Sequence, residues 1–167
     1  MGSLEFREVP QLEERIRLAS GNHELELDPN CYGTAFFLFG VLPYEVVIFT
    51  HQGHRRIKEA VSRMHPLDSP QDNSLIISSD RFGNPLHAAF LEAASPFKGY
   101  HRMGSQGPFR EFTKIQDIEE YLIACCRHPL DTGPHVYNHQ FYALNKSDNL
   151  SDWAEERVGE YSPGWRW

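Results

Sequence analysis

The apolar pattern of this chain changes at residues 65–74, and this change limits the possible folds more than any other feature. Before it, apolar residues recur at helical spacing over 10–19 and 54–64. Residues 65–74 are rich in Pro, Asp, Ser and Asn, which is typical of a loop. After them come short apolar segments separated by Gly and Pro. Helices followed by mostly antiparallel strands predict an α+β fold.

Two of the later segments make the clearest pair of elements. Residues 75–79 and 86–91 have the composition of strands, and the turn residues 80–85 lie between them, so a β-hairpin is expected. The other expected elements are helices over 31–40 and 115–127, strands over 99–103, 109–113 and 135–144, and either a strand or a further helical turn over 44–50.

Length and charge narrow the class of protein. The 167 residues suit one domain over 1–167, with a core of about 28–145 and a polar tail over 147–167 that can dock onto the body or a protein partner. The net charge of −7 argues against nucleic acid as the main partner. No apolar run has the roughly 18 residues of a membrane helix, so no membrane partner is expected.

The N-terminal residues and the cysteines bear on the compartment. No basic segment followed by an apolar one opens the chain, which predicts a cytoplasmic location as written, or export by a route without a classical signal peptide. Three cysteines, of which Cys125 and Cys126 are adjacent, are a poor disulfide framework and favour a reducing compartment.

Cys31 is the candidate nucleophile. It follows the turn residues Pro29 and Asn30 and precedes an apolar run of helical length, so its thiol falls near the first turn of a helix. Free backbone N–H groups and the positive end of the helix dipole favour a thiolate there. A thiolate attacks carbonyl carbon, so the position predicts nucleophilic chemistry.

Histidines on expected strands supply candidate partners for that thiol. A nucleophilic cysteine needs an imidazole to take its proton, and the imidazole needs a third group to hold its tautomer. His87 and His101 lie on successive strands, and we expect them to be the base and the orienting group. His139 is the alternative third residue. His51 and His54 complete no zinc pattern, so neither a metal nor an organic cofactor is expected.

Four short motifs give the chain a family resemblance. Asn30-Cys31-Tyr32-Gly33 resembles the Asp-Cys-Ser-Gly helix start of the NlpC/P60 (papain-like) cysteine peptidases, with Asn and Tyr in place of the usual Asp and Ser. Residues 74–77 resemble the family's Gly-Asp-Leu-Val-Phe-Phe strand. Residues 86–91 resemble the His-Val-Gly-Ile-Tyr strand that carries the catalytic base. Residues 100–105 resemble the Ile-His-Ala-Ser segment that carries the third polar residue. The order is the same as in the family.

The resemblance implies a fold and an activity. It implies a papain-like domain in which N-terminal helices, including the cysteine helix, pack on an antiparallel sheet. It implies a cysteine hydrolase that cleaves an amide bond of a peptide, an isopeptide or a peptidoglycan stem peptide through an acyl-enzyme. Cys31, His87 and His101 are the expected triad, and Tyr32, Ser105 and Gln106 are expected to contact the peptide or acyl substrate.

Two alternatives stay open at this point. The first is a non-catalytic protein-binding module that keeps the fold and has lost turnover, with the acidic surface and the tryptophan-rich tail as the binding features. The second is a thiol acyltransferase or deamidase that uses the same three residues.

Overall fold

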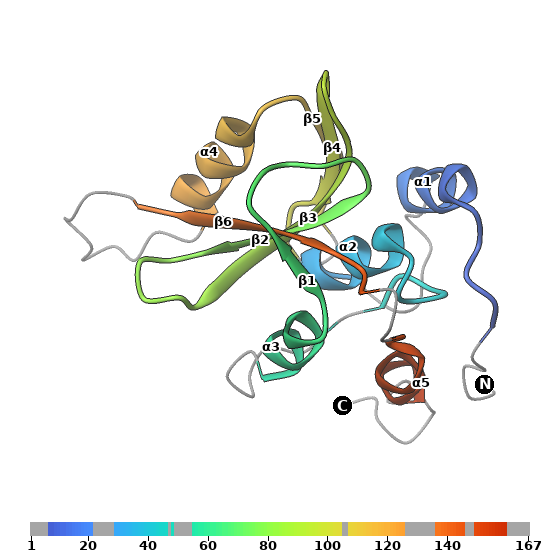
Figure 1. Ribbon diagram of the computed structural model, residues 1–167. Coiled ribbons are helices and arrows are strands. Elements are labelled where there is room, and N and C mark those ends of the chain that lie inside the picture. The colour runs from blue at the N-terminus through green and yellow to red at the C-terminus, as the bar shows by residue number, and fades with distance from the viewer. Residues whose placement is uncertain are drawn as a thin grey trace.

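A six-stranded antiparallel sheet forms the centre of the molecule (Figure 1). The computed structural model describes residues 7–21, 29–46, 48, 55–104, 107–125, 136–145 and 149–159. The strands are β1 (His65–Leu67), β2 (Ser74–Ser79), β3 (Pro85–Ala94), β4 (Phe97–Arg102), β5 (Phe109–Phe112) and β6 (Asn138–Ala143). Their order in the sheet is β1-β6-β2-β3-β4-β5.

The described helices are α1 (Leu12–Gly21), α2 (Cys31–Phe39), α3 (Arg55–Ser62), α4 (Ile115–Cys125) and α5 (Ser151–Gly159). The predicted α+β class is confirmed. No helix among the described residues is both long enough and apolar enough to cross a membrane.

The predicted hairpin is formed by β2 and β3. Ile76 pairs with Ala89 and Ser78 with His87. The turn between the strands is closed by the Asp80 side chain, which accepts hydrogen bonds from the backbone N–H groups of Phe82 and Asn84. Local turn chemistry and the strand-like composition of the two segments therefore agree, which is why this part of the fold can be predicted from the sequence.

Helix α2 is buried along its whole length. The side chain of Asn30 caps its N-terminus by accepting a hydrogen bond from Gly33, and Gly40 ends it in the left-handed conformation with φ 89°. An apolar sequence on every side of a nine-residue helix predicts burial on every side. The helix packs between the sheet, α1 and α5, and contributes seven of the buried residues of one core cluster.

The sheet separates two apolar clusters. The first, which we call the α2 cluster, joins α2 to inward-facing residues of the strands such as Leu75, Ala88 and Phe90. The second, the α4 cluster, joins Ile118 and Leu122 of α4 to the opposite face of the same strands. Figure 1 shows α2 and α4 on opposite sides of the sheet. One face of the sheet therefore packs against α2 and the other against α4, and each face has a separate apolar cluster.

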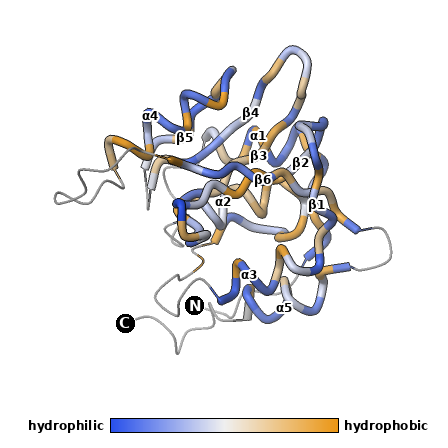
Figure 2. The backbone as a smooth tube through the Cα atoms, turned by 60° about the vertical axis from the view of Figure 1, so that its left-hand side comes forward, coloured by the Kyte–Doolittle hydropathy of each residue, from blue (hydrophilic) through white to orange (hydrophobic). Residues whose placement is uncertain are grey.

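Two sequence predictions need correction or refinement. Residues 65–74 were expected to be a loop, but His65–Leu67 form the edge strand β1, which pairs with β6. The described part of 44–50, namely residues 44–46 and 48, lies in no helix or strand. The docking expected of the polar tail is seen in its described part, where α5 buries Trp153 against the α2 cluster. In Figure 2, α3 and α5 mix hydrophilic and hydrophobic residues, as surface helices with one buried face do.

Candidate functional site

His87 and His101 meet on the sheet face that α4 covers. Nε2 of His87 lies 2.9 Å from Nδ1 of His101, and the two rings are arranged edge to face with centroids 5.1 Å apart. Both rings contact the Tyr121 ring of α4, with centroid distances of 4.9 Å and 5.8 Å. The structure therefore brings together the two histidines that were expected to be base and orienting group.

Burial keeps this histidine pair neutral. It lowers the pKa of His87 well below its usual value, and the imidazoles of His101 and His139 act in the same direction. It also lowers the pKa of His101 to about 4, against a smaller opposing effect of the Asp117 carboxylate. A neutral imidazole has one donor and one acceptor nitrogen, so the two rings can share one hydrogen bond. Nδ1 of His87 is buried and has no hydrogen-bond partner among the described residues.

Cys31 is the first residue of α2, as its sequence predicts. Its residue is 7% exposed and belongs to the α2 cluster. The preceding Asn30 is held in place by Ile48, because its Oδ1 accepts from the Ile48 N–H and its Nδ2 donates to the Ile48 carbonyl oxygen. The predicted helix start is confirmed, and the thiol there is largely buried.

The sheet lies between Cys31 and the two histidines. Side chains alternate between the two faces of a strand. On β3, Ala88 and Phe90 enter the α2 cluster, whereas Ala89 and Leu91 enter the α4 cluster. His87 shares the face of Ala89 and Leu91, in agreement with its contact to Tyr121.

The same alternation operates on β4. Arg102 reaches α2 by a hydrogen bond to Thr34, so the neighbouring His101 points to the opposite face. The structure therefore pairs His87 with His101 on the face of the sheet opposite to the α2 cluster, to which Cys31 belongs. The expected contact between Cys31 and His87 stays a prediction.

A second polar chain lies beside the histidine pair, on the same face. It consists of Ser78 on β2, His139 on β6 and Glu119 on α4. Oγ of Ser78 is 2.8 Å from Nδ1 of His139, and Nε2 of His139 is 2.9 Å from Oε1 of Glu119. Ser78 is also the sheet neighbour of His87. His139, the alternative orienting group for the thiol site, instead connects Ser78 to Glu119.

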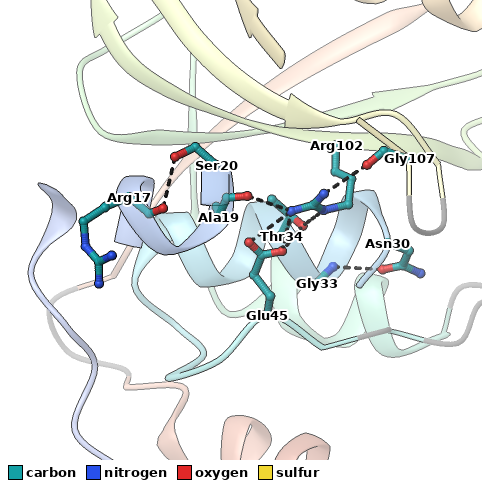
Figure 3. Close-up of polar contacts among 9 residues, drawn as sticks. All are labelled: Arg17, Ala19, Ser20, Asn30, Gly33, Thr34, Glu45, Arg102 and Gly107. Atoms are coloured by element: carbon teal, nitrogen blue, oxygen red, sulfur yellow. Dashed lines mark hydrogen bonds and ion pairs between the residues drawn. The ribbon is translucent and has the colours of Figure 1, made fainter. Parts of the chain in front are cut away.

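A buried ion pair occupies the other face of the sheet, beside α2. Figure 3 shows the Arg102 guanidinium between α1, α2 and the loop after β4. It donates to Thr34 Oγ1 at 2.9 Å, to Glu45 Oε2 at 2.8 Å, to the Ala19 carbonyl at 3.1 Å and to the Gly107 carbonyl at 3.0 Å. Burial raises the pKa of the Glu45 carboxyl, while Arg102 and Thr34 oppose that rise. This network connects elements far apart in the chain and has no free acid–base group.

A hollow of about 430 Å³ adjoins the Ser78–His139–Glu119 chain. We call it the α4 hollow. Its wall comes from the N-terminal end of α4 and from residues of β4 and β6, and it includes His139. The rings of Phe97 and Phe141 and the side chain of Ile115 give it an apolar lining, and Lys114 is also among the lining residues. Its volume is within the range of small-molecule sites.

The other predicted site residues have mixed outcomes. Tyr32 is 4% exposed and belongs to the α2 cluster, so its burial does not suit a substrate contact. Ser105 and Gln106 lie outside the described residues, as do His51 and His54. Within the described part of the chain, no group of three or more His, Cys, Asp or Glu side chains has the geometry to hold a metal ion.

Ser78, Glu119 and Tyr121 were not predicted from the sequence to be neighbours of the histidines. The sequence holds one local signal for the position of His87. Alternation along 86–91 puts His87 on the face of Ala89 and Leu91, but the sequence does not say which helix covers that face.

No protein family, curated protein or solved structure matches this chain. Its function must therefore be argued from its own side chains.

Proposed function

We propose that this chain is a non-catalytic binding module whose ligand occupies the α4 hollow. The observation that carries the proposal is the position of Cys31 on one side of the sheet and of His87 and His101 on the other. A thiol becomes an efficient nucleophile beside an imidazole or another positive group. A papain-like, NlpC/P60-type fold is part of the proposal, supported by a cysteine-bearing helix packed against an antiparallel sheet.

The buried histidine pair supports a structural role for His87 and His101. Their residues are 1% and 4% exposed, respectively. General acid–base catalysis requires a group within hydrogen-bond reach of the substrate and a pKa near the working pH. Both pKa values are lowered by burial, so the pair holds β3, β4 and α4 together rather than exchanging protons with a substrate.

The α4 hollow supplies the binding site that the proposal needs. It has about 430 Å³ of space, an apolar lining and a few polar groups at its wall, including His139. Sites for small molecules are typically concave and apolar, with a few polar groups that fix orientation.

The tail does not supply the binding surface through Trp153. The buried Trp153 is packed against Phe36, so this part of the tail binds the body of the chain.

Thiol reactivity tests the proposal against the cysteine hydrolase expected from the sequence. We would treat native Cys126→Ser protein with iodoacetamide at pH 6 and pH 8 and follow Cys31 and Cys125 by peptide mass spectrometry. Cys125 is exposed and Cys31 buried. We expect Cys125 to react first at both pH values, and Cys31 to react at a similar rate only after unfolding in urea.

The opposite order would overturn the proposal. Alkylation of Cys31 ahead of Cys125 at pH 6 would require an accessible thiolate. Loss of that fast reaction in His87→Gln protein would then assign the base and restore the thiol hydrolase.

Hydrolysis at Ser78 is a second candidate, favoured by the two hydrogen bonds that join Ser78, His139 and Glu119. In such a reaction Ser78 Oγ would form a bond to a carbonyl carbon as its proton passes to Nδ1 of His139. The leaving group would take that proton, and water would then cleave the acyl-serine ester. Glu119 would orient the imidazole and balance its charge. This candidate ranks second because Ser78 is only 1% exposed.

A fluorophosphonate probe separates this candidate from the binding module. The probe forms a covalent bond with an activated serine oxygen and needs no knowledge of the substrate. The binding module predicts no more labelling of the native chain than of the matched Ser78→Ala chain. Labelling at Ser78 that is lost in His139→Gln protein would make the chain a serine hydrolase.

A further inference from the structure

We infer that the α4 hollow selects a small organic anion with an aromatic or aliphatic body. This inference rests on the proposed function, because it names the class of ligand that the same hollow takes. Its basis is the combination of an apolar lining with Lys114, the one Lys or Arg among the described residues of the lining.

The lining favours an apolar body. Phe97, Ile115 and Phe141 are each only partly buried, and all three also contact the α4 cluster. Their inner surfaces are therefore supported by the core while their outer surfaces line the hollow. A ligand ring placed there removes apolar surface of both the ligand and the protein from water. This burial is favourable in proportion to the area covered. A space of about 430 Å³ suits a body of two or three rings.

The ammonium group of Lys114 favours a negative group on the ligand. Lys114 is the only Lys or Arg among the described residues that line the hollow. Its Nζ lies 3.9 Å from Oδ1 of Asp117, at the limit of an ion pair, and its side chain is 59% exposed. An ion pair this long and this exposed contributes little to stability. The ammonium group of Lys114 can therefore turn toward a ligand.

The nearby carboxylates do not cancel that preference. Glu119 is 2.9 Å from His139 Nε2, and Asp117 accepts a hydrogen bond from the backbone N–H of Thr113. Neither acidic group is among the described residues that line the hollow, whereas Lys114 is. The whole chain carries a net charge of −7, so attraction of an anion has to come from a local cation, and Lys114 is at the right place.

Two matched probes test the inference. The dye 8-anilinonaphthalene-1-sulfonate has an aromatic body with a sulfonate, and N-phenyl-1-naphthylamine has the same body without it. We expect both to bind with increased fluorescence. Lys114→Gln should weaken the sulfonate about 3- to 5-fold, the scale of one exposed ion pair, and leave the neutral probe within 2-fold. Lys58→Gln removes a charge from α3, which contributes no residue to the lining of the hollow, and should change the affinity of neither probe.

A steric variant separates the proposed binding of a ligand in the α4 hollow from the inferred preference of the hollow for anions. Gln116 is exposed and lies in the wall of the hollow, so Gln116→Trp should fill it and weaken both probes at least 5-fold. Near-UV circular dichroism of each variant shows that the fold is native. If Gln116→Trp alters neither probe, the hollow is not the binding site and the proposed function fails. If Gln116→Trp weakens both but Lys114→Gln weakens them equally or not at all, the hollow binds ligands and the preference for anions is overturned.

Discussion

Nε2 of His87 and Nδ1 of His101 are 2.9 Å apart in a buried site that is closed by the ring of Tyr121. The two histidines lie on the neighbouring strands β3 and β4 and are covered by α4. Their contacts with Tyr121 therefore help to hold α4 in its position on the sheet. Because both rings are held neutral, protonation of either one opposes the folded state.

Acidification should therefore destabilise the protein through His101. Its pKa is about 4 in the folded chain and about 6.5 when unfolded. Between these values the unfolded chain binds more protons, so stability falls as the pH decreases from about 6.5 toward 4. We expect His101 to contribute on the order of 2 kcal/mol to the loss between pH 7 and pH 5, measured by urea unfolding.

His101→Gln should reduce this pH dependence, whereas His65→Asn, at an exposed site on β1, should not. A histidine NMR titration of the native protein gives an independent check. A midpoint for His101 near 6.5 would contradict the neutral buried pair.

Loss of Arg102 should destabilise the fold strongly. Its guanidinium is 2.8 Å from the Glu45 carboxylate, and both side chains are almost fully buried. Removal of one partner leaves the other charge buried and uncompensated, which typically costs about 3–5 kcal/mol. We expect Arg102→Met to lower the free energy of unfolding by that amount in urea titrations.

The double variant Arg102→Met/Glu45→Gln should recover part of the loss, because it removes both charges. Arg110→Met, on the exposed side of β5, should change the free energy of unfolding by less than about 0.5 kcal/mol. Equal losses in the single and double variants would show that the ion pair is not what stabilises this region.

The sequence predicted those parts of the fold whose signals are local. The hairpin of β2 and β3 has its turn residues, Asp80 to Asn84, inside the segment that they organise. Helix α2 has Asn30 before it and Gly40 after it. The packing partners of Arg102 are much harder to predict, because Thr34 and Glu45 lie 68 and 57 residues away in the chain.

The candidate site was predicted in part for the same reason. The pairing of His87 with His101 follows from two adjacent strands, and it is confirmed. The side of the sheet on which Cys31 lies depends on how α2 packs, which no local pattern specifies. A one-residue change in strand alternation moves a side chain to the other face, so the order of three residues in a motif does not ensure that they meet.

Gly33 should be intolerant of any side chain. A Cβ atom there would overlap the backbone carbonyl of Val46, and both residues belong to the tightly packed surroundings of α2. Overpacking in a rigid core costs about 1–3 kcal/mol, and more where backbone must move. We expect Gly33→Ala to lower the thermal midpoint and the urea midpoint clearly.

Gly21 is the matched control for this substitution. It ends α1, and a Cβ atom there would meet nothing within 4 Å. Gly21→Ala should be neutral or slightly stabilising, because alanine is the better helix former. A Gly33→Ala protein as stable as Gly21→Ala would mean that residues 31–46 pack differently from this structure.

Trp153 should anchor α5 to the body of the protein. Its residue is 1% exposed, and its ring lies 5.1 Å from that of Phe36 on α2. Truncation of a buried tryptophan to alanine removes a large apolar contact and typically costs about 3–5 kcal/mol. Trp153→Phe should cost less, since it keeps a ring in the site and removes Nε1, a buried donor without a partner among the described residues.

Urea unfolding followed by circular dichroism measures the stability of both variants. Glu155→Ala, at an exposed position of the same helix, is the control. Equal stability of Trp153→Ala and Glu155→Ala would show that α5 does not dock on α2.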